Sequence, residues 1–119
     1  MEYTLGEMEQ RFADLIWEHA PVGSGELVKL AAEVLDWKKS TTYTVLRRLC
    51  EKGLFANENG IVSAKMNKDQ WKGMQSESFV KETFGGSLPM FLAAFTSRKK
   101  LTEDEIEALR KMIAEADGK

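Results

Sequence analysis

Residues 37–53, with the sequence WKKSTTYTVLRRLCEKG, combine two kinds of surface on one predicted helix. Successive residues of an α-helix are turned by about 100°, so side chains three or four positions apart share a face. The apolar face of residues 38–52 holds Thr42, Val45, Leu46 and Leu49, whereas the opposite face holds Ser40, Thr44, Arg47 and Glu51, flanked by Tyr43 and Arg48. Gly53 follows where a helix commonly ends, because glycine readily adopts the left-handed conformation. We therefore predict a helix that packs on one side and presents hydroxyl and guanidinium groups on the other.

The charge of this stretch departs from the average of the chain. Residues 37–53 hold five cations and one acid, a net charge of +4 (5 − 1), whereas residues 101–119 hold three cations and six acids, a net of −3 (3 − 6). The whole chain has a net charge of −2 and an isoelectric point of about 5.5. Those averages alone argue against nucleic acid, because a DNA-binding protein must neutralise phosphates. The local distribution instead indicates a basic helix and an acidic C-terminal segment.

The segments before this helix predict two more helices. Residues 5–19 place apolar side chains at helical spacing, and Pro21 and Gly23 then interrupt the pattern. A second helix is expected to begin near Ser24, a plausible N-cap, and its apolar stripe extends to Leu35.

The segments after it predict a hairpin and three helices. Residues 54–66 are expected to form two short strands around Asn59-Gly60, because both turn residues tolerate the positive φ of a type I′ turn. Asn67 is expected to cap a helix over residues 67–84. Two further helices are expected, the last of them opened by a capping box at residues 102–105.

This order is typical of a winged helix-turn-helix followed by further helices. In that fold the third helix enters the major groove of DNA, and the hairpin, called the wing, lies along the backbone beside it. We predict a mainly α (α+β) fold with a winged-helix DNA-binding domain at residues 1–66 and a helical dimerisation domain at residues 67–119. A C-terminal half of about 53 residues with three helices buries little apolar surface alone, and its Leu and Phe residues favour a symmetric partner.

The outward face of residues 38–52 is chemically suited to DNA. Hydroxyl groups bind phosphate oxygens or base edges, threonine methyls pack on thymine methyls, and arginine donates two hydrogen bonds to guanine. The candidate DNA-binding residues are Lys38, Lys39, Ser40, Thr41, Tyr43, Thr44, Arg47 and Arg48. Two alternatives stay open: a solvated helix face, and a winged helix that binds another protein without DNA. The acidic isoelectric point favours the second alternative.

Catalytic and metal sites find little support in the sequence. The single His and the single Cys provide no nucleophile–base pair, and the sequence contains no HExxH motif, Cys/His cluster or glycine-rich phosphate loop. We interpret His19 as a packing or surface residue and Cys50 as a small buried hydrophobe. The acids of residues 103–107 complement the dipole of the helix that they begin, which explains them without a metal ion. From these observations together we predict no enzyme activity, cofactor or metal. One Cys excludes an internal disulfide framework, and without a signal peptide or an apolar run of about 18 residues the expected location is the cytoplasm.

Several stretches together resemble a known family. They are Leu5-Gly6-Glu7-Met8-Glu9 with Ile16-Trp17, residues 36–54, Phe84-Gly85-Gly86-Ser87-Leu88, and residues 101–109. An early glutamate, a tryptophan on the first helix and a W-x-x-x-T-x-x-T-x-L-x-R-L-x-x-K-G recognition helix are similar to the penicillinase-repressor family, which comprises BlaI, MecI and the related copper repressors CopY. The similarity spans about residues 5–115. It implies a dimeric transcriptional repressor that places two winged helices on a palindromic double-stranded DNA operator.

The resemblance also implies which residues act. Thr41, Thr44 and Arg48 match operator-contacting positions of the family, and Ser40, Tyr43 and Arg47 share or adjoin their surface. Dimer contacts are expected from Phe84, Leu88, Phe91, Leu92, Phe95, Ile106, Leu109 and Ile113. Some of these apolar side chains are expected to fill the local core instead.

The sequence departs from the family in three places. Family wings are commonly basic and aromatic, whereas this hairpin carries Glu58 and no cation before Lys65. The copper-repressor branch ends in a Cys-rich motif that residues 116–119 lack, which argues against copper sensing by that route. In the β-lactam-responsive branch a membrane sensor-protease triggers cleavage at an Asn-Phe bond, and Ala94-Phe95 stands at the equivalent place here, so that partner has no support in this sequence.

Overall fold

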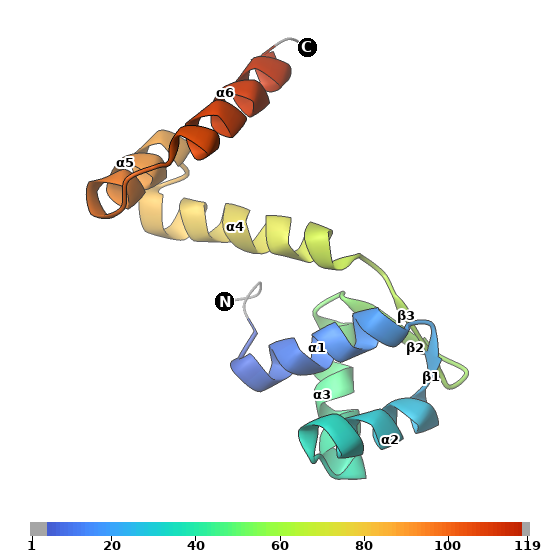
Figure 1. The fold of residues 1–119 in the computed structure, drawn as a ribbon. Helices are drawn as coiled ribbons and strands as arrows, with labels where there is room; N and C mark the ends of the chain where they lie inside the picture. Colours follow the sequence, from blue (N-terminus) through green and yellow to red (C-terminus); the bar gives the residue numbers. More distant parts are fainter. Residues whose placement is uncertain (1–4, 118–119) are drawn as a thin grey trace. The chain divides into compact units, whose positions relative to one another are not determined.

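The computed structural model describes residues 5–117, which form six helices and three short strands (Figure 1). The elements follow the order α1 (Glu7–His19), β1 (Val22–Gly23), α2 (Ser24–Leu35), α3 (Lys39–Glu51), β2 (Phe55–Glu58), β3 (Ile61–Ala64), α4 (Lys68–Phe84), α5 (Leu88–Arg98) and α6 (Glu103–Asp117). This order confirms the predicted fold class, a winged helix-turn-helix followed by C-terminal helices.

The chain divides into two compact units, and the boundary between them lies within α4. The first unit ends at Ser78 and the second begins at Phe79. Trp71, near the start of α4, is completely buried in the core of the first unit. The predicted division into functional domains at residues 1–66 and 67–119 stays a prediction.

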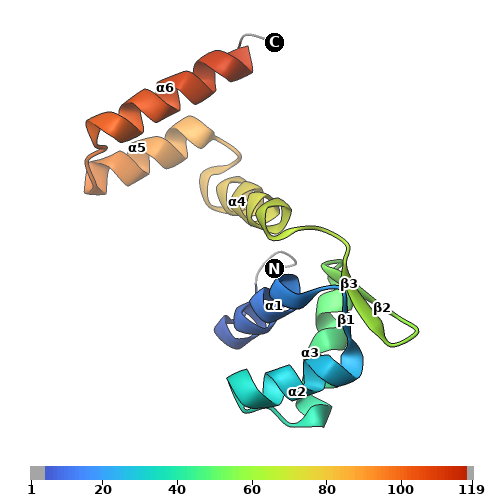
Figure 2. The same ribbon diagram turned by 45° about the vertical axis from the view of Figure 1, so that its right-hand side comes forward.

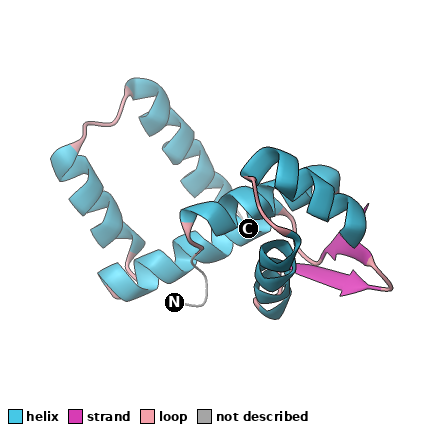
Figure 3. Ribbon diagram, turned by 90° about the horizontal axis from the view of Figure 1, so that it is seen from below, coloured by secondary structure: helices cyan, strands magenta, loops and turns pink. Residues whose placement is uncertain are grey.

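The small sheet of the first unit is antiparallel and has the strand order β1-β3-β2 (magenta in Figure 3). Asn59 and Gly60 have φ angles of 55° and 76°, which are the two positive values of a type I′ turn. The predicted hairpin is therefore confirmed. The strand β1 was not predicted, because two residues paired across the chain, such as Val22 with Val62, leave no local pattern.

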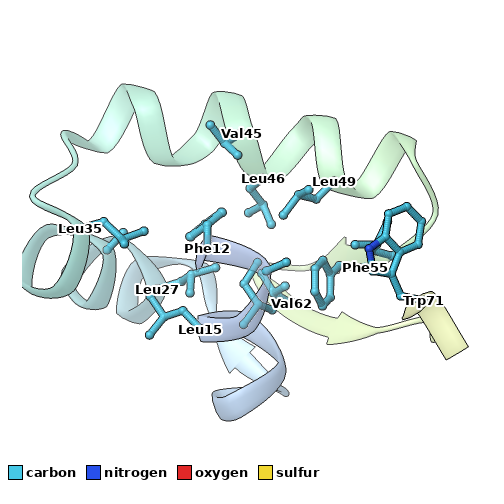
Figure 4. Packing of buried hydrophobic residues seen from close by; sticks show 14 residues of the cluster. Phe12, Leu15, Leu27, Leu35, Val45, Leu46, Leu49, Phe55, Val62 and Trp71 are labelled. Atoms are coloured by element: carbon cyan, nitrogen blue, oxygen red, sulfur yellow. The ribbon is translucent and has the colours of Figure 1, made fainter. Parts of the chain in front are cut away.

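The core of the first unit lies between α1, α2, α3 and the sheet (Figure 4). Val45, Leu46 and Leu49 point from α3 into this core, so the apolar face predicted for that helix is confirmed. The hydroxyl of Thr42 is buried on the same face and donates a hydrogen bond of 3.1 Å to the carbonyl oxygen of Lys38. The buried hydroxyl is thus satisfied within its own helix.

The C-terminal end of α3 is closed by two backbone hydrogen bonds around Gly53. Gly53 has a φ of 89°, and its N–H donates to the carbonyl oxygen of Cys50 at 3.0 Å. The N–H of Leu54 donates to the carbonyl oxygen of Leu49 at 3.1 Å. These two bonds form a Schellman motif, which confirms the helix end predicted from the glycine.

The predicted N-cap of α2 is wrong. Ser24 is the first residue of the helix and Gly23 is the N-cap, which makes no side-chain capping bond. The backbone of Ser24 is held instead by the sheet, because its N–H donates to the carbonyl oxygen of Gly60 at 2.8 Å. Its side chain is therefore available for another partner.

Side chains cap the three C-terminal helices, and the caps at Asn67 and Thr102 are those that the sequence predicts. Reciprocal hydrogen bonds between a cap side chain and a residue three positions later open α4, from Asn67 and Gln70, and α6, from Thr102 and Glu105. The hydroxyl of Ser87 accepts the N–H of Met90 at 3.1 Å and opens α5. Figure 2 shows α5 and α6 as the consecutive helices of the second unit.

Candidate nucleic-acid interface

The position of α3 within the first unit is set by Tyr43 as well as by the core. The ring of Tyr43 packs against the core, and its hydroxyl donates a hydrogen bond of 3.3 Å to the hydroxyl of Ser24 at the start of α2. Tyr43, predicted as a DNA contact, is therefore half-buried and joins the two helices of the helix-turn-helix.

The outward side of α3 carries most of the predicted DNA-binding residues. The exposed ones are Lys38, Lys39, Ser40, Thr41, Arg47 and Arg48, whereas Tyr43 and Thr44 are half-buried. We call these eight residues the α3 surface. None of its cations is buried, so each can reach an anionic partner.

Two hollows lie beside α3, and each is lined in part by residues of the α3 surface. The first has a volume of about 240 Å³ and is lined by Ser40, Thr41, Thr44, Val45 and Arg48. The second has a volume of 340 Å³ and is lined by Tyr43, Leu46, Arg47, Cys50 and Asn57 of the wing. The structure thus brings the hydroxyl-bearing residues together with Arg48, and places Arg47 on the side that faces the wing.

One residue outside α3 lies close to two cations at the C-terminal end of that helix. The sequence alone did not assign this residue to the site. Glu9, in the first turn of α1, places its Oε2 atom 3.9 Å from Nη1 of Arg48 and its Oε1 atom 4.0 Å from Nζ of Lys52. Helical spacing could not predict these pairs, because they join two helices that are distant in the sequence. The only signal was the early glutamate shared with the family that the sequence resembles.

The wing, which lies beside the α3 surface, carries no cation. Residues 57–61 are exposed at the tip of the hairpin, and they include the carboxylate of Glu58. No Lys or Arg occurs between β2 and the end of β3, and the first cation after the hairpin is Lys65. The departure from a basic wing that the sequence indicates is therefore present in the folded chain.

Cys50 lines the second hollow and is half-buried. Burial raises the pKa of its thiol, the charge of Glu51 raises it further, and Lys65 lowers it. A thiol with a raised pKa is a poor nucleophile at neutral pH, because the thiolate is the reactive form. Within residues 5–117, no three His, Cys, Asp or Glu side chains are placed to hold a metal ion, and no helix is long and apolar enough to cross a membrane.

The second unit carries the predicted dimerisation residues. The rings of Phe79, Phe84, Phe91 and Phe95 form a cluster in which Phe91 contacts the other three at centroid distances of 5.6–6.1 Å. Half-buried residues of the predicted set are Phe84, Phe91, Leu92 and Leu109, and exposed ones are Leu88, Phe95, Ile106 and Ile113. Neither α5 nor α6 contains a fully buried side chain, and the exposed members of this set leave an apolar surface on the two helices.

A model of the family described as "Penicillinase repressor" matches residues 5–115. This chain belongs to the penicillinase repressor family. The penicillinase repressor of Bacillus licheniformis is 24% identical to it over 115 residues, which cover 93% of this chain and 90% of that protein. The methicillin resistance regulatory protein MecI of Staphylococcus aureus strain Mu50 is also 24% identical over 115 residues, which cover 93% of this chain and 94% of that protein.

Membership of the penicillinase repressor family confirms two predictions from the sequence. The chain is a transcriptional repressor, and it belongs with regulators rather than with enzymes. The family assignment covers both structural units, because the match begins at residue 5, just before α1, and ends at residue 115, within α6. The role of the α3 surface in DNA binding and the role of the predicted dimerisation residues stay predictions.

Proposed function

We propose that this penicillinase-repressor family member acts as a homodimer that binds a palindromic DNA operator, with α3 of each protomer in the major groove. The observation that carries the proposal is the two-sided character of α3. Its apolar side is buried in the core, and its other side exposes hydroxyl groups and cations. A helix held in this way can enter a groove without loss of the fold.

The chemistry of the α3 surface supports a division of tasks. Lys38 and Lys39, at the start of the helix, are suited to phosphate oxygens, which position the protein on the duplex. Thr41, Thr44 and Arg48 share one hollow and are suited to base edges, where threonine methyls and guanidinium groups discriminate between base pairs. The wing carries Glu58 and no cation, so it is expected to add little to phosphate binding.

Dimerisation is supported by the exposed apolar residues of the second unit. The helix α6 leaves most of its apolar stripe exposed, and such a helix gains stability when a second copy covers it. Two copies related by two-fold symmetry would present two α3 surfaces to one duplex. The operator is then expected to be a palindrome, because each half-site meets the same residues.

Selection of bound duplexes from a random-sequence library tests DNA binding and symmetry together. We expect recovery of a palindrome that the protein binds with nanomolar affinity, and a steep loss of affinity between about 50 mM and about 200 mM salt. Recovery of no preferred sequence, with no retention of any duplex at the lower salt concentration, would refute the proposal.

A matched pair of substitutions tests the role of the α3 surface. Arg48→Ala is expected to weaken binding to the selected duplex by about 1–3 kcal/mol if its guanidinium reads a base. Lys72→Ala removes the same charge from an exposed position on α4 and is expected to have a much smaller effect. Equal losses from both variants would show that total charge, rather than the α3 surface, determines binding.

A second matched pair tests the dimer. Ile113 on α6 and Ile61 on the wing are 64% and 49% exposed, so neither substitution by Asp disturbs a buried position. Light scattering is expected to give twice the chain mass of 13.5 kDa for the unsubstituted protein and for Ile61→Asp. Ile113→Asp is expected to shift the mass towards that of a monomer, and a monomeric unsubstituted protein would contradict the proposed dimer.

The second candidate function is a winged helix that binds another protein without DNA. The acidic Glu58 on the wing and the isoelectric point of about 5.5 favour it. Capture of a protein partner by a chain that retains no duplex would support this function in place of the first.

The proposal does not include release by a sensor-protease. Ala94 and Phe95 lie inside α5, and the carbonyl oxygen of Ala94 also accepts a hydrogen bond of 2.7 Å from the hydroxyl of Ser97. Cleavage of this bond would first require local unfolding of the helix.

A further inference from the structure

Glu9 occupies a fixed position beside the cations at the end of α3. Its Oε1 atom accepts a hydrogen bond of 3.0 Å from the backbone N–H of Gly6, which closes the first turn of α1. The Glu9 side chain is 22% exposed, so it is partly withdrawn from solvent. The backbone bond and the partial burial keep the carboxylate in place.

Arg48 is much freer than the carboxylate that it faces. Its side chain is 59% exposed, and the 3.9 Å between the two charged groups is longer than a hydrogen bond. The contact is therefore Coulombic, and Arg48 can leave it without breaking a directed bond. Lys52, at 4.0 Å from the same carboxylate, experiences the same charge.

We propose that Glu9 competes with DNA for Arg48 and Lys52, and thereby limits the affinity of the repressor for any duplex. The inference rests on the proposed DNA-binding function and names a residue that tunes it. The carboxylate acts in two ways: it attracts two cations that the DNA would otherwise attract, and it repels the phosphates of the DNA. Both effects weaken binding, so the loss of this charge must strengthen it.

Glu9→Gln is the variant that separates the charge from the cap. A glutamine amide oxygen can still accept the N–H of Gly6, whereas the negative charge is lost. Glu7→Gln is the matched control, because Glu7 is an exposed acid in the same first turn and no ion pair joins it to α3 among the described residues. Both variants change the net charge of the chain equally.

The probe is a mixed-sequence duplex, so the measurement needs no knowledge of the operator. Glu9→Gln is expected to raise affinity about two- to five-fold for each protomer at about 50 mM salt, the range for an exposed ion pair. The increase is expected to shrink at about 200 mM salt, because salt screens the charges. Glu7→Gln is expected to have a clearly smaller effect, and thermal melting is expected to be similar for both variants.

A double substitution, Arg48→Ala with Lys52→Ala, tests whether Glu9 acts through these two cations. In that background Glu9→Gln is expected to change the affinity no more than Glu7→Gln does. The salt concentration at which each variant leaves a heparin column provides the same comparison for variants that bind DNA weakly.

Three results would overturn the inference while the proposed function stands. They are weaker binding by Glu9→Gln, an increase no larger than that of Glu7→Gln, and an increase that persists in full when Arg48 and Lys52 are replaced. The absence of duplex binding by every variant, including the unsubstituted chain, would instead refute the proposed function and this inference with it.

Discussion

Trp71 is expected to make the start of α4 an essential part of the winged-helix unit. Its side chain is completely buried in the core of the first unit, although α4 continues beyond that unit. Replacement of a buried tryptophan by alanine typically costs about 3–5 kcal/mol. A unit of about 78 residues has a total stability of about 4–12 kcal/mol, so Trp71→Ala removes a large share of it.

Urea denaturation followed by far-UV circular dichroism measures this loss. For a slope of about 2 kcal/mol per molar urea, the expected shift is about 2 M towards lower urea. A fragment of residues 1–78 is expected to fold, whereas a fragment of residues 1–66, which lacks Trp71, is expected to be largely unfolded. Lys72→Ala, an exposed neighbour on the same helix, is the control and is expected to leave the midpoint nearly unchanged.

The reasoning would be refuted if the 1–66 and 1–78 fragments unfolded at the same urea concentration. A midpoint for Trp71→Ala within about half a molar of the unsubstituted protein would refute it equally, because the cavity cost would then be absent. Either result would support a domain boundary at residue 66 rather than one inside α4.

Three further predictions concern stability and reactivity. Gly53→Ala is expected to destabilise the first unit by about 1–2 kcal/mol in urea denaturation, because its φ of 89° is strained for alanine; an unchanged midpoint would contradict this. Alkylation of Cys50 is expected to be slower at neutral pH than that of free cysteine and to accelerate at a higher pH, because burial and the charge of Glu51 raise its pKa; equal rates would contradict this. Phe91→Ala is expected to lower the melting temperature of the protein, because it removes three ring contacts worth about 0.5–1.5 kcal/mol each; an unchanged temperature would contradict this.

Local patterns were sufficient to predict much of the fold. The apolar spacing of α3, the turn at Asn59-Gly60 and the end of α3 at Gly53 each depend on residues a few positions apart. The capping box that begins at Thr102 has the same local character. Such features are readable because propensity and side-chain spacing determine them before any distant contact forms.

Features that join distant segments could not be read in this way. The pairing of β1 with β3, the burial of Trp71 and the contact of Glu9 with Arg48 all depend on the folded arrangement. Tyr43 shows the same limit, because its position on the helix does not reveal that its hydroxyl donates a hydrogen bond to Ser24. A helical wheel identifies which side a residue faces but not which partner it meets there.

The hydrogen bond between Tyr43 and Ser24 has a consequence for the energetics of the proposed binding to DNA. Because it links α2 and α3 in the unbound chain, the two helices can dock as a preformed rigid body. Little conformational entropy is then lost on docking, and the heat-capacity change should reflect the contact area alone. Calorimetry on Tyr43→Phe, which keeps the ring and loses the bond, should reveal a larger entropic penalty.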